Sequence, residues 1–473
     1  MRVSTSFPAF EPGSFRDPDT KVFRHDGVIF RCLTSRALED WTQLTATDFF
    51  ARLSADGTLI PTEHVTDRSG LPDLEPKWAA VLRHQTVPFI SYPYEWPFGM
   101  LRDAALLQLD LIGTALDEGM TLKDATPFNI QWIGSRPTFI DLGSFTAYQP
   151  GEPWAGYRQF CEQFLYPLFL QAYKNVPFHP WVRGRLEGMT AEVCRSLLSV
   201  RDYFRPGVLT HVYLQAKAQT RYEDSDRDIK NDLRAAGFGA ALIKNNLTRL
   251  RRTVERLEWN PLRSTWSEYE QQHSYDDVDV QRKSNFVRRV LAPRRWSIVW
   301  DIGCNTGTYA RLAAEHAEHV LALDADHVVI DRFYHRLKKE GDSTILPLVA
   351  DVADPSPGLG WRGRERRSLD DRGSPELILC LALIHHVVIG RNIPIADLIE
   401  WLAGFGADLV IEFVNHGDPM VDKLLRNRVS QEVEYSAGAL EAALARSFGA
   451  VVQEALESGS RTLYHAQAKT HAA

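Results

Sequence analysis

Acidic residues and glycines follow two apolar runs in the second half of the chain. Residues 298–300 lead into Asp301, as a buried parallel strand does at its carboxyl edge. Gly303 and Gly307 then flank a tight turn before a helical pattern, a geometry that lets backbone N–H groups approach a ligand closely. A second apolar run ends in Asp324, about 20 residues further on, where nucleotide-binding sheets place a ribose-binding carboxylate.

The spacing of these residues discriminates between kinds of nucleotide site. A dinucleotide fingerprint needs glycines where this chain has Asn305 and Thr308, and a P-loop needs a lysine after Gly307, so both are disfavoured. Asp301, Gly303, Asn305 and Gly307 instead resemble motif I of the class I S-adenosylmethionine (SAM)-dependent methyltransferases, D-x-G-x-G-x-G. Asn305 replaces the middle glycine, and asparagine tolerates a left-handed backbone, so we expect the turn to form.

The resemblance implies roles for residues outside the turn. In such a methyltransferase Asp324 would hold the ribose hydroxyls, and Asp351, which follows the next apolar run, would lie beside the adenine. Tyr275 lies where this family often places a helical lid, and an aromatic face there would suit the positive charge of the sulfonium. An ordinary docking helix is the alternative explanation for Tyr275.

Two adjacent histidines follow a later apolar run, residues 377–381. His385 and His386 should emerge at the carboxyl edge of the sheet, at the position that in the resembled family faces the transferred methyl group. Neutral imidazole is well matched to accepting a hydroxyl proton near pH 7. We expect His386 to be this base, with Glu412 on the next strand as its orienting group or an alternative base. The alternative is that both histidines only cap the following segment.

The elements that must position these residues form a repeating pattern. Five strand–helix units follow one another from residue 298, and a hairpin at 451–457 and 462–466 closes the series. This order predicts an α/β, Rossmann-like methyltransferase domain with a mostly parallel seven-stranded sheet over residues 265–473. The phrase at 411–421, IEFVNHGDPMV, and the pairing of two domains also look similar to host-specific nodulation proteins.

A second group of polar residues lies in the first half of the chain. Asp124 and Asn129 have the spacing D-x-x-x-x-N, and a strand pair leads on to Asp141-Leu-Gly. This segment resembles the catalytic loop and metal-binding segment of protein-kinase-like folds, including the aminoglycoside phosphotransferase type. The resemblance implies Asp124 as the base on an acceptor hydroxyl, with Asn129 and Asp141 holding Mg²⁺ on the phosphates of ATP.

The first half also departs from that family. No glycine-rich loop precedes its first hairpin, and no lysine occupies the third-strand position, where Arg31 is the nearest candidate to pair with Glu39. We predict an α+β kinase-like domain over residues 1–220, active or degenerate, and a helical linker over 221–264. Within the domain we expect a hairpin at 21–33, one helix over 35–53, a strand at 87–94 and a long helix at 102–118.

Composition limits the remaining possibilities. The 473 residues carry a net charge of −7, which disfavours a dedicated nucleic-acid binder, and five scattered cysteines read as reduced thiols. Without a signal peptide or a membrane-length apolar run, we expect a cytoplasmic protein that does not bind membranes. The favoured function is methyl transfer from SAM to a hydroxyl of a small molecule or glycoconjugate. A bifunctional protein with a live phosphotransferase and a non-catalytic nucleotide- and SAM-binding regulator are the alternatives.

Overall fold

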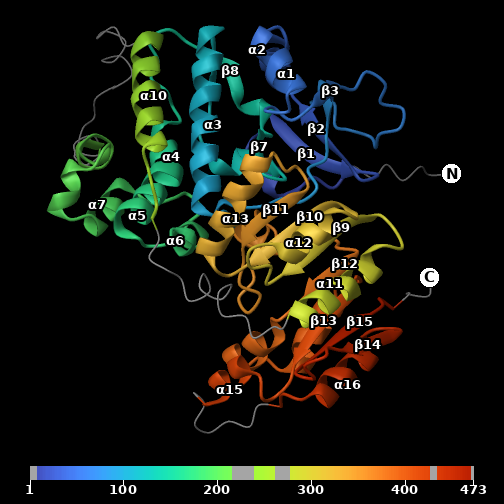
Figure 1. Ribbon diagram of the computed structural model, residues 1–473. Helices are drawn as coiled ribbons and strands as arrows, with labels where there is room; N and C mark the ends of the chain where they lie inside the picture. The colour runs from blue at the N-terminus through green and yellow to red at the C-terminus, as the bar shows by residue number, and fades with distance from the viewer. Residues whose placement is uncertain (1–7, 216–238, 261–276, 427–433, 470–473) are drawn as a thin grey trace. The chain divides into compact units, whose positions relative to one another are not determined.

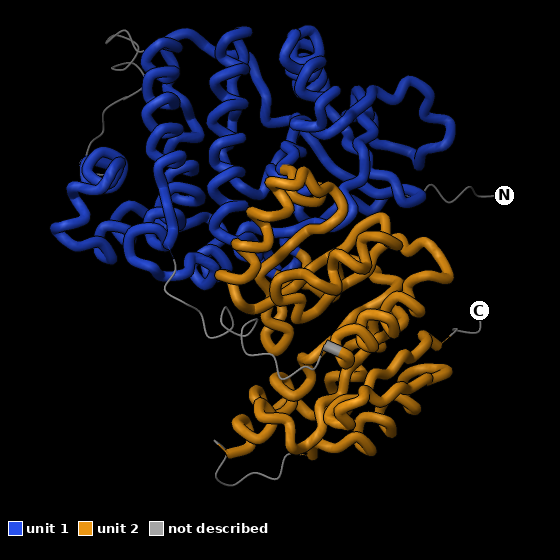
Figure 2. The backbone as a smooth tube through the Cα atoms, in the orientation of Figure 1, with its two compact units in different colours: residues 1–132, 137–260, 359–366 blue, residues 133–136, 261–358, 367–473 orange. Residues whose placement is uncertain are grey.

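The computed structural model describes residues 8–215, 239–260, 277–426 and 434–469. The chain divides into two compact units, coloured separately in Figure 2. Unit 1 comprises residues 1–132, 137–260 and 359–366, and unit 2 comprises residues 133–136, 261–358 and 367–473. The helix expected in a linker, α10 (Ala240–Glu255), therefore belongs to unit 1. No helix in the described ranges is long and apolar enough to cross a membrane.

Unit 1 begins with an antiparallel sheet of four strands. Their order is β1-β2-β4-β3, with bounds Thr20–His25 (β1), Val28–Leu33 (β2), Thr62–His64 (β3) and Ala80–His84 (β4). The predicted hairpin is confirmed, with Asp26 and Gly27 in left-handed conformations at its turn. Phe23, Phe30 and Trp78 are buried in a small core on this sheet.

Two of the elements expected in unit 1 differ from the prediction. The helix expected over 35–53 is two helices, α1 (Ser35–Thr45) and α2 (Asp48–Ala55), because the Thr47 hydroxyl caps a new helix by accepting from Phe50 N. The strand expected at 87–94 is wrong, since Pro88 and Pro93 cannot donate to a ladder. The strand in this part of the chain is β4, which ends at His84, just before the expected segment.

The rest of unit 1 is mainly helical. The long helix α3 (Phe98–Asp117) runs beside α10 in Figure 1, and Arg251 of α10 pairs with Asp110 of α3 at 2.6 Å. Two short strand pairs follow α3: β5 (Met120–Leu122) with β8 (Phe145–Ala147), and β6 (Ile130–Ile133) with β7 (Arg136–Phe139). The other helices are α4 (Tyr157–Phe160), α5 (Tyr166–Lys174), α6 (His179–Gly184) and α7 (Ala191–Leu197).

Unit 2 contains the predicted seven-stranded, mostly parallel sheet, ordered β11-β10-β9-β12-β13-β15-β14. The strands are β9 (Trp296–Ile302), β10 (Ala317–Asp324), β11 (Ile345–Val349), β12 (Leu377–Cys380), β13 (Asp408–Val414), β14 (Val451–Ala455) and β15 (Arg461–Ala466). The first five are parallel, and β15 is antiparallel to both β13 and β14. The Rossmann-like methyltransferase fold expected for this half is thereby confirmed.

One helix precedes β9, and the other helices of unit 2 lie in connections between its strands. In chain order the helices are α11 (Asp277–Leu291), α12 (Thr308–Ala314), α13 (His327–Glu340), α14 (Ile395–Ala403), α15 (Pro419–Arg426) and α16 (Ala437–Ser447). Residues 320–323 of β10 are all buried, as expected for a strand covered on both faces. The strand order reverses between β9 and β12, and open α/β sheets bind ligands at the carboxyl edge beside such a reversal.

Candidate functional site

The turn after β9 is hydrogen-bonded to the neighbouring strand, β10. The backbone N–H groups of Gly303 and Cys304 both donate to the Leu323 carbonyl of β10, at 2.8 and 3.0 Å. Asn305 has φ 47°, the left-handed conformation expected for the residue that replaces the middle glycine. Gly307 has φ 88° directly before α12, and a Cβ atom there would overlap the Phe333 ring. The turn therefore requires glycine at 307 for two separate reasons.

Asp324 lies at the end of β10 and links the turn to the next loop. Its Oδ2 accepts from the Asn305 backbone N–H, and its Oδ1 accepts from the Asp326 N–H, both at 2.9 Å. Burial raises the pKa of the Asp324 carboxyl. Each oxygen keeps a lone pair, so this carboxylate can still accept hydrogen bonds from a ligand.

Two buried oxygens of the turn have no hydrogen-bond partner in the described chain. They are Asp301 Oδ2 and Asn305 Oδ1. Burial raises the pKa of Asp301 to about 7, which shows how far this carboxyl is removed from water. Buried polar atoms are rarely left unpaired in folded proteins. A ligand that offers hydrogen-bond donors, such as the hydroxyl and ammonium groups of SAM, would fit them.

The other predicted cofactor contacts lie at the same edge or outside the described residues. Asp351 follows β11 and is half-buried; its Oδ2 pairs with Arg391 at 2.6 Å, and its Oδ1 accepts from Ala353 N. Three adjacent strands, β11, β10 and β9, thus carry Asp351, Asp324 and the turn, respectively, at their carboxyl ends. Tyr275 lies outside the described residues.

The two histidines lie in a helical segment. They were expected to continue an extended strand, but that strand, β12, already ends at Cys380. His385 immediately precedes the π-helix His386–Gly390. His385 is fully buried, and neither of its ring nitrogens has a partner among the described residues. His386 is half-buried, and burial lowers its pKa to about 4. Both rings are therefore neutral near pH 7.

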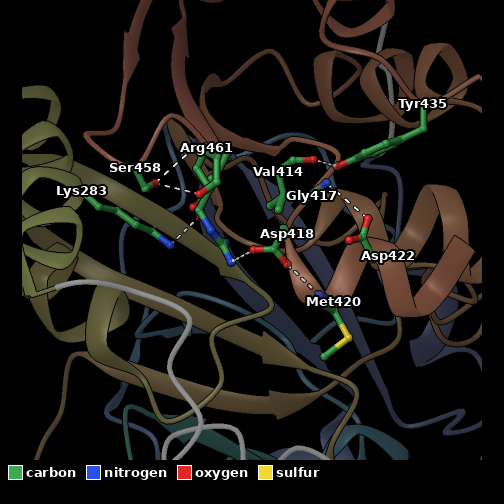
Figure 3. Close-up of polar contacts among 11 residues, drawn as sticks. Lys283, Val414, Gly417, Asp418, Met420, Asp422, Tyr435, Ser458 and Arg461 are labelled. Atoms are coloured by element: carbon green, nitrogen blue, oxygen red, sulfur yellow. Dashed lines mark hydrogen bonds and ion pairs between the residues drawn. The ribbon is translucent and has the colours of Figure 1, made fainter.

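Glu412 is held in a buried network of charges. Its carboxylate pairs with Lys283 Nζ of α11 at 2.6 Å and with Arg461 Nη1 of β15 at 3.3 Å, and Arg461 Nη2 pairs with Asp418 at 2.8 Å. All four side chains are at most 4% exposed, and Figure 3 shows Lys283, Arg461 and Asp418 converging. The Lys283 ammonium also lies over the Tyr309 ring at 4.8 Å. To act as a base, Glu412 would have to give up these ion pairs.

Asp418 and Arg461 were not predicted as members of the site, and Lys283, expected in the helical lid, was not predicted as a partner of Glu412. A signal for them was present, because Glu412 is a single carboxylate inside the apolar run 409–414 and must be paired or neutralised when buried. The sequence does not identify the partners, since they lie 129 and 49 residues away from Glu412.

In unit 1 the predicted polar residues also lie close together. Asp141 accepts from Arg31 Nη1 at 2.8 Å. Arg31, the nearest candidate to pair with Glu39, thus pairs with Asp141, and Glu39 is exposed. Ile140 N donates to the Asn129 carbonyl, which places Asn129 beside the Asp141 segment. Asp124 is exposed, and partial desolvation and the charge of Asp141 raise its pKa.

Comparison with known proteins gives one relative along almost the whole chain. The nodulation protein NoeA of Rhizobium meliloti (strain 1021) is 33% identical over 465 residues, which cover 97% of this chain and 96% of NoeA. No protein-family model matches the sequence.

Solved structures of methyltransferases align with part of the chain. The N-methyltransferase NodS from Bradyrhizobium japonicum WM9, in complex with S-adenosyl-L-homocysteine, is 14% identical and covers 43% of this chain and 97% of NodS, with a TM-score of 0.30. The magnesium protoporphyrin IX methyltransferase ChlM from Synechocystis PCC 6803 is 11% identical and covers 43% of this chain and 94% of ChlM, also with a TM-score of 0.30.

Proposed function

Because the chain belongs to the family of the nodulation protein NoeA, we propose that it is a SAM-dependent methyltransferase whose acceptor is a hydroxyl of a small molecule or glycoconjugate involved in nodulation. The methyltransferase fold of unit 2 supports the reaction class. The name of the relative supports the biological setting of the acceptor.

The observation that carries the proposal is the link between Asp324 and the turn after β9. Asp324 fixes Asn305 through its Oδ2, and the turn presents the unpartnered oxygens of Asp301 and Asn305 beside it. In this arrangement Asp324 would accept from the ribose hydroxyls of SAM. Gly303 and Gly307 would allow the backbone to approach the cofactor, and Asp351 would lie beside the adenine.

Bound SAM supplies a methyl group on a positively charged sulfur, so the protein mainly binds, aligns and, for a hydroxyl acceptor, removes a proton. We assign the proton-accepting role to His386, which is neutral near pH 7. A base with a pKa of about 4 is weaker than the optimum near the working pH. Glu412 is better suited to holding α11 and β15 in place than to accepting the proton.

The first test is SAM binding to the full-length protein by titration calorimetry. Asp324→Ala removes two acceptor atoms and should weaken SAM binding by roughly 2 kcal/mol. Glu318→Ala is the matched control, because Glu318 is an exposed carboxylate near the opposite end of the same strand. Equal SAM affinity in the wild type and Asp324→Ala would remove Asp324 from the site. Tighter binding of NAD than of SAM would contradict the methyltransferase assignment.

The acceptor itself can be sought with isotopically labelled SAM. Incubating the protein with methyl-labelled SAM and extracts of bacteria that carry out nodulation should label one class of hydroxyl-bearing molecule, identified by mass spectrometry. Asp324→Ala serves as the negative control. Labelling on nitrogen or carbon would retain the methyltransferase assignment but contradict the hydroxyl acceptor.

A further inference from the structure

Unit 1 contains an ion pair at the position where its kinase-like pattern would place a metal. Arg31 lies on β2, which β1 and β4 flank, and its Nη1 donates to Asp141 Oδ1 at 2.8 Å and to Thr20 Oγ1 at 3.3 Å. The two charged side chains are 11% and 26% exposed. A pair this sheltered from water interacts more strongly than a surface pair does.

The same carboxylate does not suit Mg²⁺ while this pair exists. Magnesium requires near-octahedral oxygen ligands at about 2.0–2.1 Å and binds through one or two carboxylates. Here Oδ1 of Asp141 is already bound to a guanidinium, which stays charged at any ordinary pH. The described residues also contain no cluster of three or more His, Cys, Asp or Glu arranged to hold a metal ion.

Three buried polar atoms around this pair have no partner among the described residues: Arg31 Nε, Asn129 Nδ2 and His84 Nε2. Arg31 and His84 lie on the same face of the sheet, because Arg31 is paired with Leu82 and His84 lies two residues further along β4. Burial, and to a lesser extent the charge of Arg31, lower the pKa of His84 to about 3, so its ring is neutral.

The neighbours of His84 determine which ring nitrogen carries the proton. Thr62 Oγ1 donates to the Ile60 carbonyl at 2.9 Å, so it must accept from His84 Nδ1, which lies 2.7 Å away. His84 Nε2 is then a bare acceptor. The charges of Arg31 and Asp141 offset each other, and the buried atoms left without a partner among the described residues are two donors and one acceptor. The pair therefore offers no net positive charge to a triphosphate.

We propose that Arg31 replaces a divalent cation beside Asp141, so that unit 1 excludes metals and metal-bound nucleotides at this position. Phosphoryl transfer, which relies on a metal to neutralise the phosphates, then does not occur there. Asn129 and Asp141 thereby keep a place in the site without acting as magnesium ligands.

The experiment measures Mn²⁺ binding to the full-length protein by electron paramagnetic resonance. The full chain is needed because unit 1 includes residues 359–366. The wild type and Asp141→Asn should bind Mn²⁺ equally weakly, without a site that depends on Asp141. Arg31→Met keeps a side chain of similar length and frees the carboxylate, so it should tighten Mn²⁺ binding roughly tenfold or more. Adding Asp141→Asn to Arg31→Met should abolish that gain.

Arg83→Met is the matched control, since Arg83 on the adjacent strand also pairs with a carboxylate, Glu63, but in an exposed position. It should create no Mn²⁺ site. Wild-type Mn²⁺ binding that is lost in Asp141→Asn would overturn the proposal, as would Asp141-dependent binding of Mg-ATP measured by calorimetry. Absence of any gain in a folded Arg31→Met protein would also overturn it. If Arg31→Met does not fold, the wild-type and Asp141→Asn titrations still decide the matter.

Discussion

The buried charge network around Glu412 gives a prediction that can be worked out from its geometry. Glu412→Gln keeps the shape of the side chain and removes its charge between Lys283 and Arg461. Removing one partner of a buried ion pair typically costs about 3–5 kcal/mol, because an uncompensated charge stays buried. Arg461 keeps Asp418 at 2.8 Å, so the loss falls mainly on Lys283 and we expect the lower value, about 3 kcal/mol.

Hydrogen exchange measured by mass spectrometry is a suitable assay, because it reports on unit 2 separately and does not require the whole chain to unfold in two states. A loss of about 3 kcal/mol corresponds to exchange roughly 150-fold faster in peptides from α11 and β13. Glu340→Gln is the matched control: its partner, Arg311, forms an exposed pair with it, so no change is expected.

A second variant tests whether the cost comes from unpaired charge. Lys283→Met combined with Glu412→Leu removes both charges and leaves Arg461 with Asp418, so it should recover a large part of the lost protection. If Glu412→Gln changes exchange in these peptides by less than about fivefold, the network does not stabilise unit 2 as argued. A double variant as damaged as the single variant would show that packing is responsible.

Further predictions concern the turn and the histidines. Gly307→Ala should abolish measurable SAM binding in calorimetry, because its Cβ would overlap Phe333, whereas Gly341→Ala, with a similar φ and open space, should cost only about 1 kcal/mol of stability in thermal unfolding. His386→Ala should retain SAM affinity while labelled-methyl transfer falls about a hundredfold, and transfer at the wild-type rate would mean that the acceptor needs no such base. Burial lowers the folded-state pKa of His386 to about 4, so the unfolded chain takes up the proton first as the pH falls below about 6.5. Stability in urea titrations should therefore fall by roughly 1.4 kcal/mol per pH unit between about pH 6 and 4 on account of this group, and less steeply in His386→Asn.

The sequence was sufficient for the parts of the fold that rest on local patterns. The apolar runs before Asp301, Asp324 and Asp351 are strands because buried parallel strands need continuous hydrophobic residues, and all three aspartates lie at the predicted edge. The left-handed turn at Asn305 followed from the conformational tolerance of asparagine. The closing hairpin was likewise visible as two short alternating runs around a glycine.

Features that depend on distant partners were not predictable in this way. Arg31 was only the nearest candidate to pair with Glu39, and its observed partner, Asp141, is 110 residues away, so only the folded chain brings the two together. His385 and His386 were expected at the end of an extended strand, but the backbone turns helical after Cys380, and no residue type between them signals this change. The ion pairs of Glu412 likewise join three elements with no common local pattern.

The order of strands in unit 2 has a consequence for synthesis of the protein on the ribosome. The strand β15 follows β14 in sequence but lies between β13 and β14 in the sheet. Until Arg461 has emerged, β13 is an unpaired apolar edge and Glu412 lacks one of its two cations. Exposed apolar edges recruit other chains, so the nascent protein passes through an aggregation-prone interval that ends only with its final strand. A nascent chain that has emerged from the ribosome beyond residue 414 but not beyond residue 461 would therefore be expected to bind chaperones more strongly than one that has emerged beyond residue 466.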